Sequence, residues 1–216
     1  MITKRIKEIR DSINKDVELV AVSKTKSNKE ILEAYNAGQK VFGENKIQEM
    51  TEKYEELPKD IKWHMVGHVQ SNKIKYMAPY VDLVHGIDSL KSLKILNKEA
   101  KKNNRVIRCL LQLKISDEFT KFGLSREEIE SILNSINILD LMNINVAGIM
   151  TIGSFTENMN VVVKEFDKTK KIFDSLKTAF PNLKILSMGM SNDYKIAINH
   201  GSNMIRVGSL IFGKRV

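Results

Sequence analysis

Eight short apolar segments separated by stretches with helical periodicity constrain the fold of this chain more than any other feature. The expected strands cover residues 18–23, 40–43, 62–67, 83–87, 106–113, 145–151, 184–188 and 204–211. Helical patterns lie between them, near residues 28–37, 45–56, 71–78, 89–103, 125–138, 158–179 and 192–200, and one more helix precedes the first strand. Segments such as "LVAV" and "VIRCLLQL" are continuously apolar, which is typical of strands buried on both faces of a parallel sheet.

Eight parallel strands joined by crossover helices predict an α/β fold, a single (β/α)8 TIM-type barrel. The pattern contains no helix after the last strand, so the extra N-terminal helix, "MITKRIKEIRDSINK", is expected to complete the outer ring. An open doubly wound sheet is the alternative. No G-x-G-x-x-G follows the first strand and no Walker loop is present, which favours the barrel. With three prolines and no Gly-rich linker, residues 1–216 are expected to form one domain.

Composition narrows the class of protein. The net charge of +9 raises the question of nucleic-acid binding, but the lysines are scattered among acidic residues and aromatic residues make up only 6%. No nucleic-acid partner is therefore expected. No apolar run has the length of a membrane span, and the N-terminus lacks an apolar signal core. The lone Cys109 excludes an intramolecular disulfide. We expect a cytoplasmic protein without a membrane association, and a complete barrel is expected to be a monomer.

A lysine stands where the first strand gives way to a helix. In "ELVAVSKTKSNKE" the apolar run ends at Ser23, Lys24 follows, and Ser27 with Glu30 forms the capping box of the next helix. In a closed barrel the eighth strand pairs with the first, so Lys24 would lie beside the end of strand eight on the face that carries active sites. Taken alone, Lys24 could equally be a surface lysine with its charge in water.

The end of strand seven is rich in small and hydroxyl-bearing residues. In "LSMGMSND", Ser187, Gly189 and Ser191 surround the expected start of a helix, for which Ser191 is the expected N-cap. Free backbone N–H groups at that position would favour an anion. Phosphate sites of barrel enzymes are often built from the loops after strands seven and eight.

Strand eight supplies the matching elements in "MIRVGSLIFG". Arg206 is an inward cation if it alternates with Val207, Gly208 permits close approach of a ligand to the backbone, and Ser209 can donate two hydrogen bonds. Each residue has an ordinary alternative: an ion pair for Arg206, a bulge for Gly208, and a plain helix cap for Ser191. Gathered beside Lys24, they suggest pyridoxal 5′-phosphate (PLP) held as a Schiff base.

These segments, together with "FGENKIQEM", "WHMVGHVQSNK" and "GIMTIG", resemble the YggS/PROSC-type pyridoxal phosphate homeostasis proteins. The resemblance runs from about Lys4 to Arg215. It implies an alanine-racemase-like barrel with PLP on the lysine after strand one. It also implies a role in buffering or delivering PLP without established catalytic turnover, with possible exchange to free amino acids and to apo PLP-dependent enzymes.

The resemblance also implies roles for individual residues. Lys24 is similar to the Schiff-base lysine, and Arg206 to the arginine that faces the pyridine nitrogen. The resemblance assigns the phosphate cradle and its glycine loop to Ser187, Gly189, Ser191, Gly208 and Ser209. It assigns other positions that line the mouth to Asn45, His68 and Met150. One departure is "TKFG" at 120–123, where the family commonly has "SKSG", so that Phe122 replaces a serine.

Arginine opposite the pyridine nitrogen would disfavour protonation of that nitrogen and weaken the ring as an electron sink. The sequence therefore predicts a PLP carrier rather than a catalyst. An amino-acid racemase or related lyase is the alternative, with its second base from His68, Tyr194 or a partner chain. A phosphosugar barrel without PLP is a third. No metal site is expected, because His64 and His68 lie on a strand-to-loop segment without the Glu of H-E-x-x-H.

Overall fold

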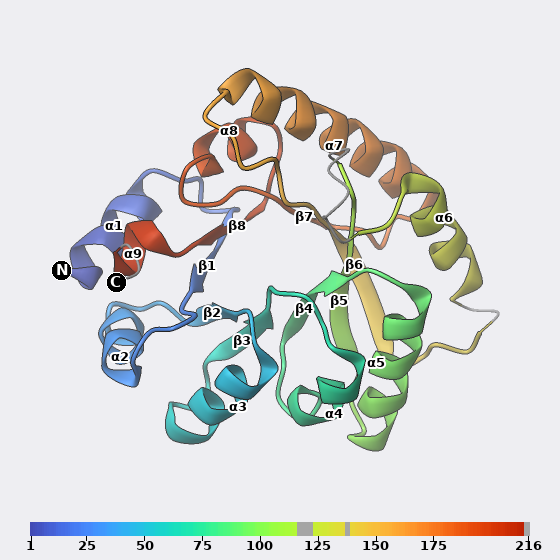
Figure 1. Cartoon of the computed structure of the whole chain (residues 1–216), viewed down its shortest axis with the longest axis horizontal. Coiled ribbons are helices and arrows are strands. Elements are labelled where there is room, and N and C mark those ends of the chain that lie inside the picture. Colours follow the sequence, from blue (N-terminus) through green and yellow to red (C-terminus); the bar gives the residue numbers. More distant parts are fainter. Residues whose placement is uncertain (116–122, 137–138, 214–216) are drawn as a thin grey trace.

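The computed structural model describes residues 1–115, 123–136 and 139–213. In this part of the chain eight parallel strands form a closed barrel in chain order, as Figure 1 shows, which confirms the predicted fold. The strands are β1 (Glu18–Val22), β2 (Val41–Glu44), β3 (Lys62–Met65), β4 (Leu83–Ile87), β5 (Ile107–Gln112), β6 (Ile144–Met150), β7 (Ile185–Ser187) and β8 (Met204–Val207).

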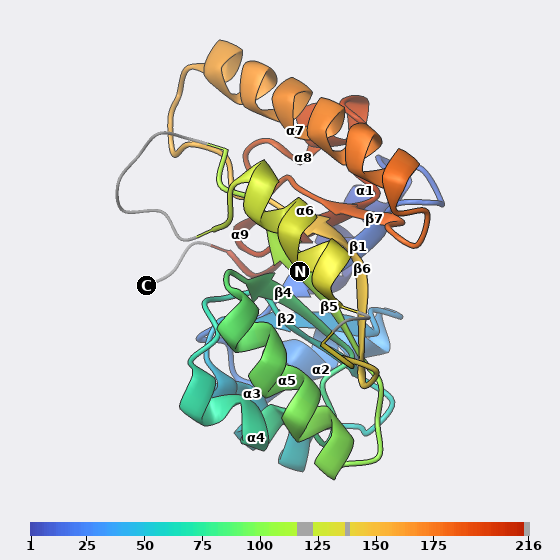
Figure 2. The same ribbon diagram turned by 90° about the vertical axis from the view of Figure 1, so that its right-hand side faces the viewer.

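At least one helix lies between each pair of consecutive strands, as predicted. Figure 2 shows the long α7 beside α6 on one side of the barrel, with α3, α4 and α5 on the other. The helices are α1 (Ile2–Asp11), α2 (Asn28–Asn36), α3 (Ile47–Glu56), the 3-10 turn η1 (Ser71–Lys73), α4 (Ile74–Met77), α5 (Leu90–Lys102), α6 (Arg126–Ser135), α7 (Met159–Ala179), α8 (Tyr194–Asn199) and α9 (Ser209–Phe212). None of these helices is long and apolar enough to cross a membrane.

The end of the last strand differs from the prediction. The strand was expected to run to residue 211 with no helix after it, but β8 ends at Val207 and α9 follows. The backbone turns at Gly208, whose carbonyl oxygen accepts hydrogen bonds from the N–H groups of Ile211 and Phe212. The apolar run "LIF" thus packs as one helical turn, with Ile211 and Phe212 buried. A run this short does not distinguish a strand from a helix.

Helix α1 completes the outer ring, as predicted. It lies beside α9 in Figure 1, and the Arg5 Nη1 atom donates to the carbonyl oxygen of Ile211 at 3.3 Å. On the other side, Arg10 Nη2 donates to the carbonyl oxygen of Gly38, just after α2, at 2.9 Å. The first helix therefore contacts both the second and the last helix of the chain.

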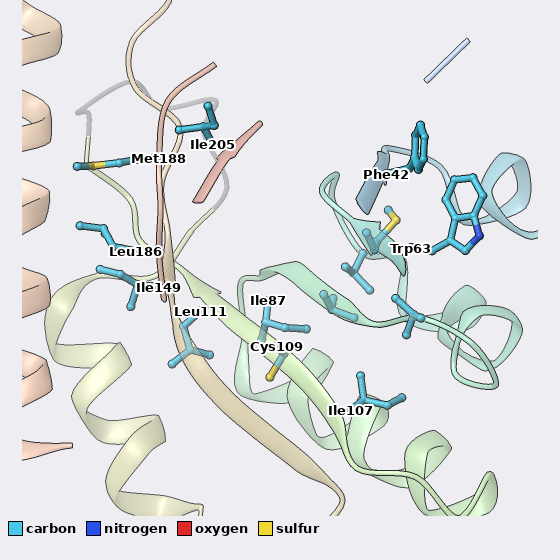
Figure 3. Close-up of a cluster of buried hydrophobic side chains, with 14 of the residues drawn as sticks. Phe42, Trp63, Ile87, Ile107, Cys109, Leu111, Ile149, Leu186, Met188 and Ile205 are labelled. Atoms are coloured by element: carbon cyan, nitrogen blue, oxygen red, sulfur yellow. The ribbon is translucent and has the colours of Figure 1, made fainter. Parts of the chain in front are cut away.

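The hydrophobic core has two parts separated by the strands. The larger part lies between the strands and the helices. Figure 3 shows Phe42 and Trp63 side by side in it, with ring centroids 6.0 Å apart. The smaller part fills the barrel and consists of Val20, Val41, Val66, Leu83, Leu110, Ala147, Met150 and Met204. Alternation along the strands separates the two, as Val20 faces inward while Leu19 and Ala21 face the helices.

Candidate functional site

The first and last strands bring Lys24 and the residues after β8 to one end of the barrel. Val20 of β1 pairs with Arg206 of β8, and Ala21 pairs with Val207. A Cβ atom added to Gly208 would lie 3.1 Å from the carbonyl oxygen of Val22, so the turn after β8 lies against the end of β1. Lys24, two residues beyond β1, is half-buried at this mouth. The expected neighbourhood is present.

Arg206 is a buried cation inside the barrel, as its predicted alternation with Val207 required. Its side chain donates from Nη1 to Ser187 Oγ at 2.7 Å and from Nη2 to the carbonyl oxygen of Thr151 at 2.8 Å. Burial lowers the pKa of Arg206 to about 10, and the negative charge of Asp193 partly opposes this. The guanidinium therefore remains charged at neutral pH and is held in a fixed orientation.

The loops after β7 and β8 contact each other through Ser191 and Gly208. The N–H group of Gly208 donates to Ser191 Oγ at 3.3 Å. Ser191 is not the N-cap of α8, contrary to expectation. That position belongs to Asp193, whose carboxylate accepts from the N–H of Met190 at 2.5 Å and so closes a turn ahead of the helix. The turn delays α8 to Tyr194 and leaves the Ser191 hydroxyl to face β8 instead.

The remaining loop residues at this end of the barrel differ in how deeply they are buried. Gly189 has φ +97°, a value that favours glycine, and its carbonyl oxygen accepts from the Arg206 N–H at 3.0 Å. Ser187 is fully buried beneath the loop, while Ser209 is exposed at the start of α9. The candidate site thus has an accessible rim at Ser191 and Ser209, two of the residues predicted for the phosphate, and a buried floor at Ser187 and Arg206.

Three more candidate residues come from other strands. Asn45 is half-buried after β2, and a Cβ added to Gly67 would lie 2.5 Å from its carbonyl oxygen, so the loops after β2 and β3 adjoin. His68 is exposed, with Nδ1 3.0 Å from Asp88 Oδ2. Met150 ends β6 and is buried in the barrel interior. Phe122, the departure from the family pattern, lies outside the described residues.

Tyr194, one source considered for a second base, does not face the mouth. Its side chain belongs to the core between the barrel and the helices, and its hydroxyl lies 3.2 Å from Ser12 Oγ after α1. This position is a correction to the suggestion that Tyr194 could supply a proton at the candidate site. Within residues 1–115, 123–136 and 139–213, no three His, Cys, Asp or Glu side chains are grouped to hold a metal ion.

A buried lysine that sequence reasoning missed holds the backbone just before Lys24. Lys53 of α3 is almost fully buried, and its Nζ donates to the carbonyl oxygen of Ser23 at 2.8 Å. The same Nζ donates to Glu44 Oε1 at 2.8 Å and Glu49 Oε1 at 2.7 Å. Ser23 Oγ also donates to Glu44 Oε1, at 2.6 Å.

The backbone just after Lys24 is held by the same group. Glu49 Oε1 accepts from the N–H of Thr25 at 2.6 Å, and Thr25 has the left-handed φ of +65° that non-glycine residues rarely adopt. Burial raises the pKa of Glu44, and the Lys53 charge works against that rise. In the sequence, Glu49 and Lys53 look like an ordinary i,i+4 surface pair. Only the fold places them under the Lys24 loop.

A contact between two buried histidines is the second feature that sequence reasoning missed, since it considered His64 only as a metal ligand and did not consider His85. His64 of β3 and His85 of β4 are fully buried, with His85 Nε2 3.1 Å from His64 Nδ1. His85 Nδ1 lies 3.3 Å from Ser187 Oγ, which joins the pair to the floor of the candidate site. Both histidines stand in apolar strand segments, where a histidine gives little indication of its role.

The structure is a closed eight-stranded barrel with Lys24 after β1 and the buried Arg206 on β8. Comparison with known proteins identifies the class to which this barrel belongs. The family model of the alanine racemase N-terminal domain matches residues 1–216. An alanine racemase structure from Clostridium difficile has a TM-score of 0.81 at 16% identity, covering 99% of this chain and 56% of that chain. That likeness shows the shared fold.

Relatives with higher sequence identity show to which family within this class the chain belongs. The chain is 39% identical to a pyridoxal phosphate homeostasis protein from Haemophilus influenzae (92% of this chain, 85% of the relative). It is 34% identical to that of Escherichia coli (99% and 97%). It also matches PipY of Synechococcus elongatus, solved with PLP bound, at 32% identity and a TM-score of 0.90, covering 99% of this chain and 100% of that chain. The chain belongs to the pyridoxal phosphate homeostasis protein family.

Proposed function

We propose that this protein binds PLP on Lys24 and serves PLP homeostasis as a carrier that holds and releases the cofactor without substantial turnover. The observation that carries the proposal is the position of Lys24 at the barrel mouth, beside the loops of β7 and β8 and above the buried Arg206, in a chain similar to a PLP-bound relative. Bound PLP would supply an aldehyde, and the Lys24 amine would hold it covalently, with water as the leaving group.

The residues present fit this group. Gly208 lies close to the Val22 backbone, and its N–H and the Ser191 hydroxyl are close enough for a phosphate to contact both. The Arg206 charge at the floor favours an anionic ligand. Gly189 and Ser209 complete the cradle, Ser187 lies buried beneath it, and Asn45, His68 and Met150 line the rest of the mouth.

Arg206 also supports the choice of carrier over catalyst. A guanidinium with a pKa of about 10 stays charged and accepts no proton at neutral pH, and it would disfavour a second positive charge on a ring nitrogen bound beside it. The outward position of Tyr194 removes one candidate acid or base from the mouth. Free amino acids and apo PLP-dependent enzymes in the cytoplasm are the proposed recipients, and a monomer is the proposed state.

The first prediction tests the lysine. After incubation with PLP and reduction by borohydride, mass spectrometry of the wild-type protein should locate the adduct on Lys24. Lys24→Ala should give no single reducible adduct while keeping the wild-type circular dichroism spectrum. Lys26→Ala is the matched control in the same loop, where Lys26 Nζ lies 3.4 Å from Glu30 Oε1, and it should be labelled normally. A full adduct on another single lysine of Lys24→Ala would overturn the assignment.

The same samples test for catalysis. The PLP-loaded protein, incubated with L-alanine in D₂O, should exchange the Cα proton no faster than free PLP and lysine do at the same concentrations. Sustained exchange or racemisation by the wild-type protein, abolished by Lys24→Ala, would replace the carrier with the enzyme alternative.

A further inference from the structure

A row of polar side chains crosses the mostly apolar interior of the barrel. From the candidate site inward, Arg206 Nη1 lies 2.7 Å from Ser187 Oγ, which lies 3.3 Å from His85 Nδ1. His85 Nε2 lies 3.1 Å from His64 Nδ1, and His64 Nε2 lies 3.2 Å from Asp82 Oδ2. Asp82 immediately precedes β4 at the opposite end of the barrel, where its side chain is 30% exposed. The row therefore joins the candidate site to the far face.

A dry interior favours neutral imidazoles, and with both histidines neutral the ends of the row determine where each proton lies. The Asp82 carboxylate can only accept, and Arg206 can only donate. His64 therefore donates from Nε2 to Asp82 and accepts on Nδ1 from His85 Nε2. His85 Nδ1 is then an acceptor, so the Ser187 hydroxyl donates to it while Ser187 Oγ accepts from Arg206. This arrangement satisfies every link of the row.

The charges around the row stabilise this arrangement. Burial lowers the pKa of His85 well below its usual value, and the positive charges of Arg206 and Arg108 act in the same direction. Although burial alone would raise the pKa of Asp82, the hydrogen bond from His64 and the charge of Arg108 hold it below its usual range. Arg108 Nη2 lies 2.5 Å from Asp82 Oδ2. The far end thus stays an anion and stays an acceptor.

We propose that His85, His64 and Asp82 are positioning residues that hold the Ser187 hydroxyl proton turned away from Arg206 and so fix the guanidinium at the site. If that proton pointed toward Arg206, two donors would face each other in a dry interior, which is costly. Ser187 then supports Arg206 from below rather than contacting phosphate. The inference rests on the proposed function only in naming PLP as the ligand to which Arg206 is presented.

The first test uses the protein without PLP. Nitrogen-15 NMR of the histidine side chains should show His64 and His85 protonated on Nε2 at pH 8, and His85 neutral down to pH 6. His64→Phe removes the acceptor of His85 but leaves the Asp82–Arg108 pair, so His85 should shift toward the Nδ1-protonated tautomer. Val41→Ala, a barrel-interior change without polar contacts, should leave His85 as in wild type. A charged or Nδ1-protonated His85 in wild type at pH 8, or an unchanged His85 tautomer in His64→Phe, would overturn the proposal.

A second pair of variants covers the case in which His64→Phe does not fold. Ser187→Ala removes the donor to His85 Nδ1, whereas Ser187→Thr keeps a hydroxyl at the same place. The His85 nitrogen shifts should change in Ser187→Ala and return to the wild-type pattern in Ser187→Thr. Equal spectra for the two variants would show that His85 does not depend on the hydroxyl, against the proposal.

The last experiment measures the affinity of each protein for PLP by equilibrium binding. In His64→Phe the hydrogen bond between the charged Arg206 and Ser187 Oγ is lost or misdirected. The variant should therefore weaken PLP binding on the order of 5- to 10-fold. Val41→Ala should stay within about 2-fold of wild type, as expected for a change away from such contacts. Wild-type affinity in His64→Phe would overturn the positioning role. A wild-type protein that does not bind PLP would instead refute the proposed function, while the NMR result on the row would stand.

Discussion

At the scale of single residues, side-chain contacts fix the backbone on both sides of Lys24. The carbonyl before it accepts from Lys53, and the N–H after it donates to Glu49, so the backbone on both sides is held by one buried ionic group. The left-handed Thr25 is kept in a rare conformation by these contacts. The consequence is that the point from which the Lys24 side chain extends stays in place.

The ionic group should be essential to stability. Lys53→Met leaves the buried carboxylate of Glu44 without its counter-charge and should lower the free energy of unfolding by about 3–5 kcal/mol, measured by urea denaturation. Lys170→Met removes an exposed i,i+4 partner of Asp174 and should cost about 0.5 kcal/mol or less. If the free energy of unfolding fell by similar amounts in the two variants, the burial of Lys53 would add nothing to stability. The fraction of Lys24 reduced with PLP should also fall in Lys53→Met, compared under conditions where both proteins are folded.

At the scale of elements, the sequence predicts most strands and helices because their periodicity is clear. The buried run before Lys24 and the capping box at Ser27 place β1 and α2 within one or two residues. The boundary between β8 and α9 was not predictable, since "GSLIF" is compatible with either structure until Gly208 turns the chain. Likewise, the N-cap of α8 depends on the contact of Asp193 with Met190, which local sequence does not determine against Ser191.

The residues of the candidate site also divide into those that the sequence predicts and those that it does not. The sequence brings Lys24 and Arg206 together, because closure of a barrel makes its first and last strands neighbours. It does not reveal the roles of Lys53 or His85, because their partners come from distant segments and each looks like a common surface or core residue. Prediction thus succeeds where topology decides the neighbours and fails where side chains meet across elements.

The junction of β1 and β2 offers a prediction about a single amide. Gln39 is buried, and its Nε2 donates to the carbonyl oxygens of Leu19 at 2.7 Å and Val41 at 2.6 Å. Gln39→Leu removes both donors and should lower the free energy of unfolding by about 2–3 kcal/mol, measured by urea denaturation. Gln48→Leu on the exposed face of α3 is the control and should change it by about 0.5 kcal/mol at most. A small effect at Gln39 would indicate that water replaces the amide.

At the scale of the whole molecule, the polar row gives the barrel a dependence on pH. The folded-state pKa of His85 lies below the unfolded value near 6.5, so the unfolded chain binds the proton first. Its contribution to stability is fully present above about pH 6.5 and is lost as the pH falls below that, by at most about 1.4 kcal/mol per pH unit. Glu44 and Asp193, whose pKa values burial raises, act in the opposite sense.

Comparison with a variant isolates the histidine. His85→Gln should be less stable than wild type at pH 7.5, but the difference between the two proteins should shrink as the pH falls from 6.5 to 5. Urea denaturation at each pH measures this, and the contributions of Glu44 and Asp193 cancel in the difference. A constant gap across the range would mean that His85 takes up its proton in the folded protein as readily as in the unfolded chain.

The pairing of β1 with β8 has a further consequence for the order of events during synthesis. Arg5 bonds to Ile211, 206 positions along the chain, and the candidate site needs residues from both ends. A nascent chain that has made seven strands still has an open seam and lacks the guanidinium and the last loop. Such long-range closure is a late step of folding. Cofactor capture would then select finished molecules, and PLP would stabilise complete barrels by mass action while leaving truncated products to proteolysis.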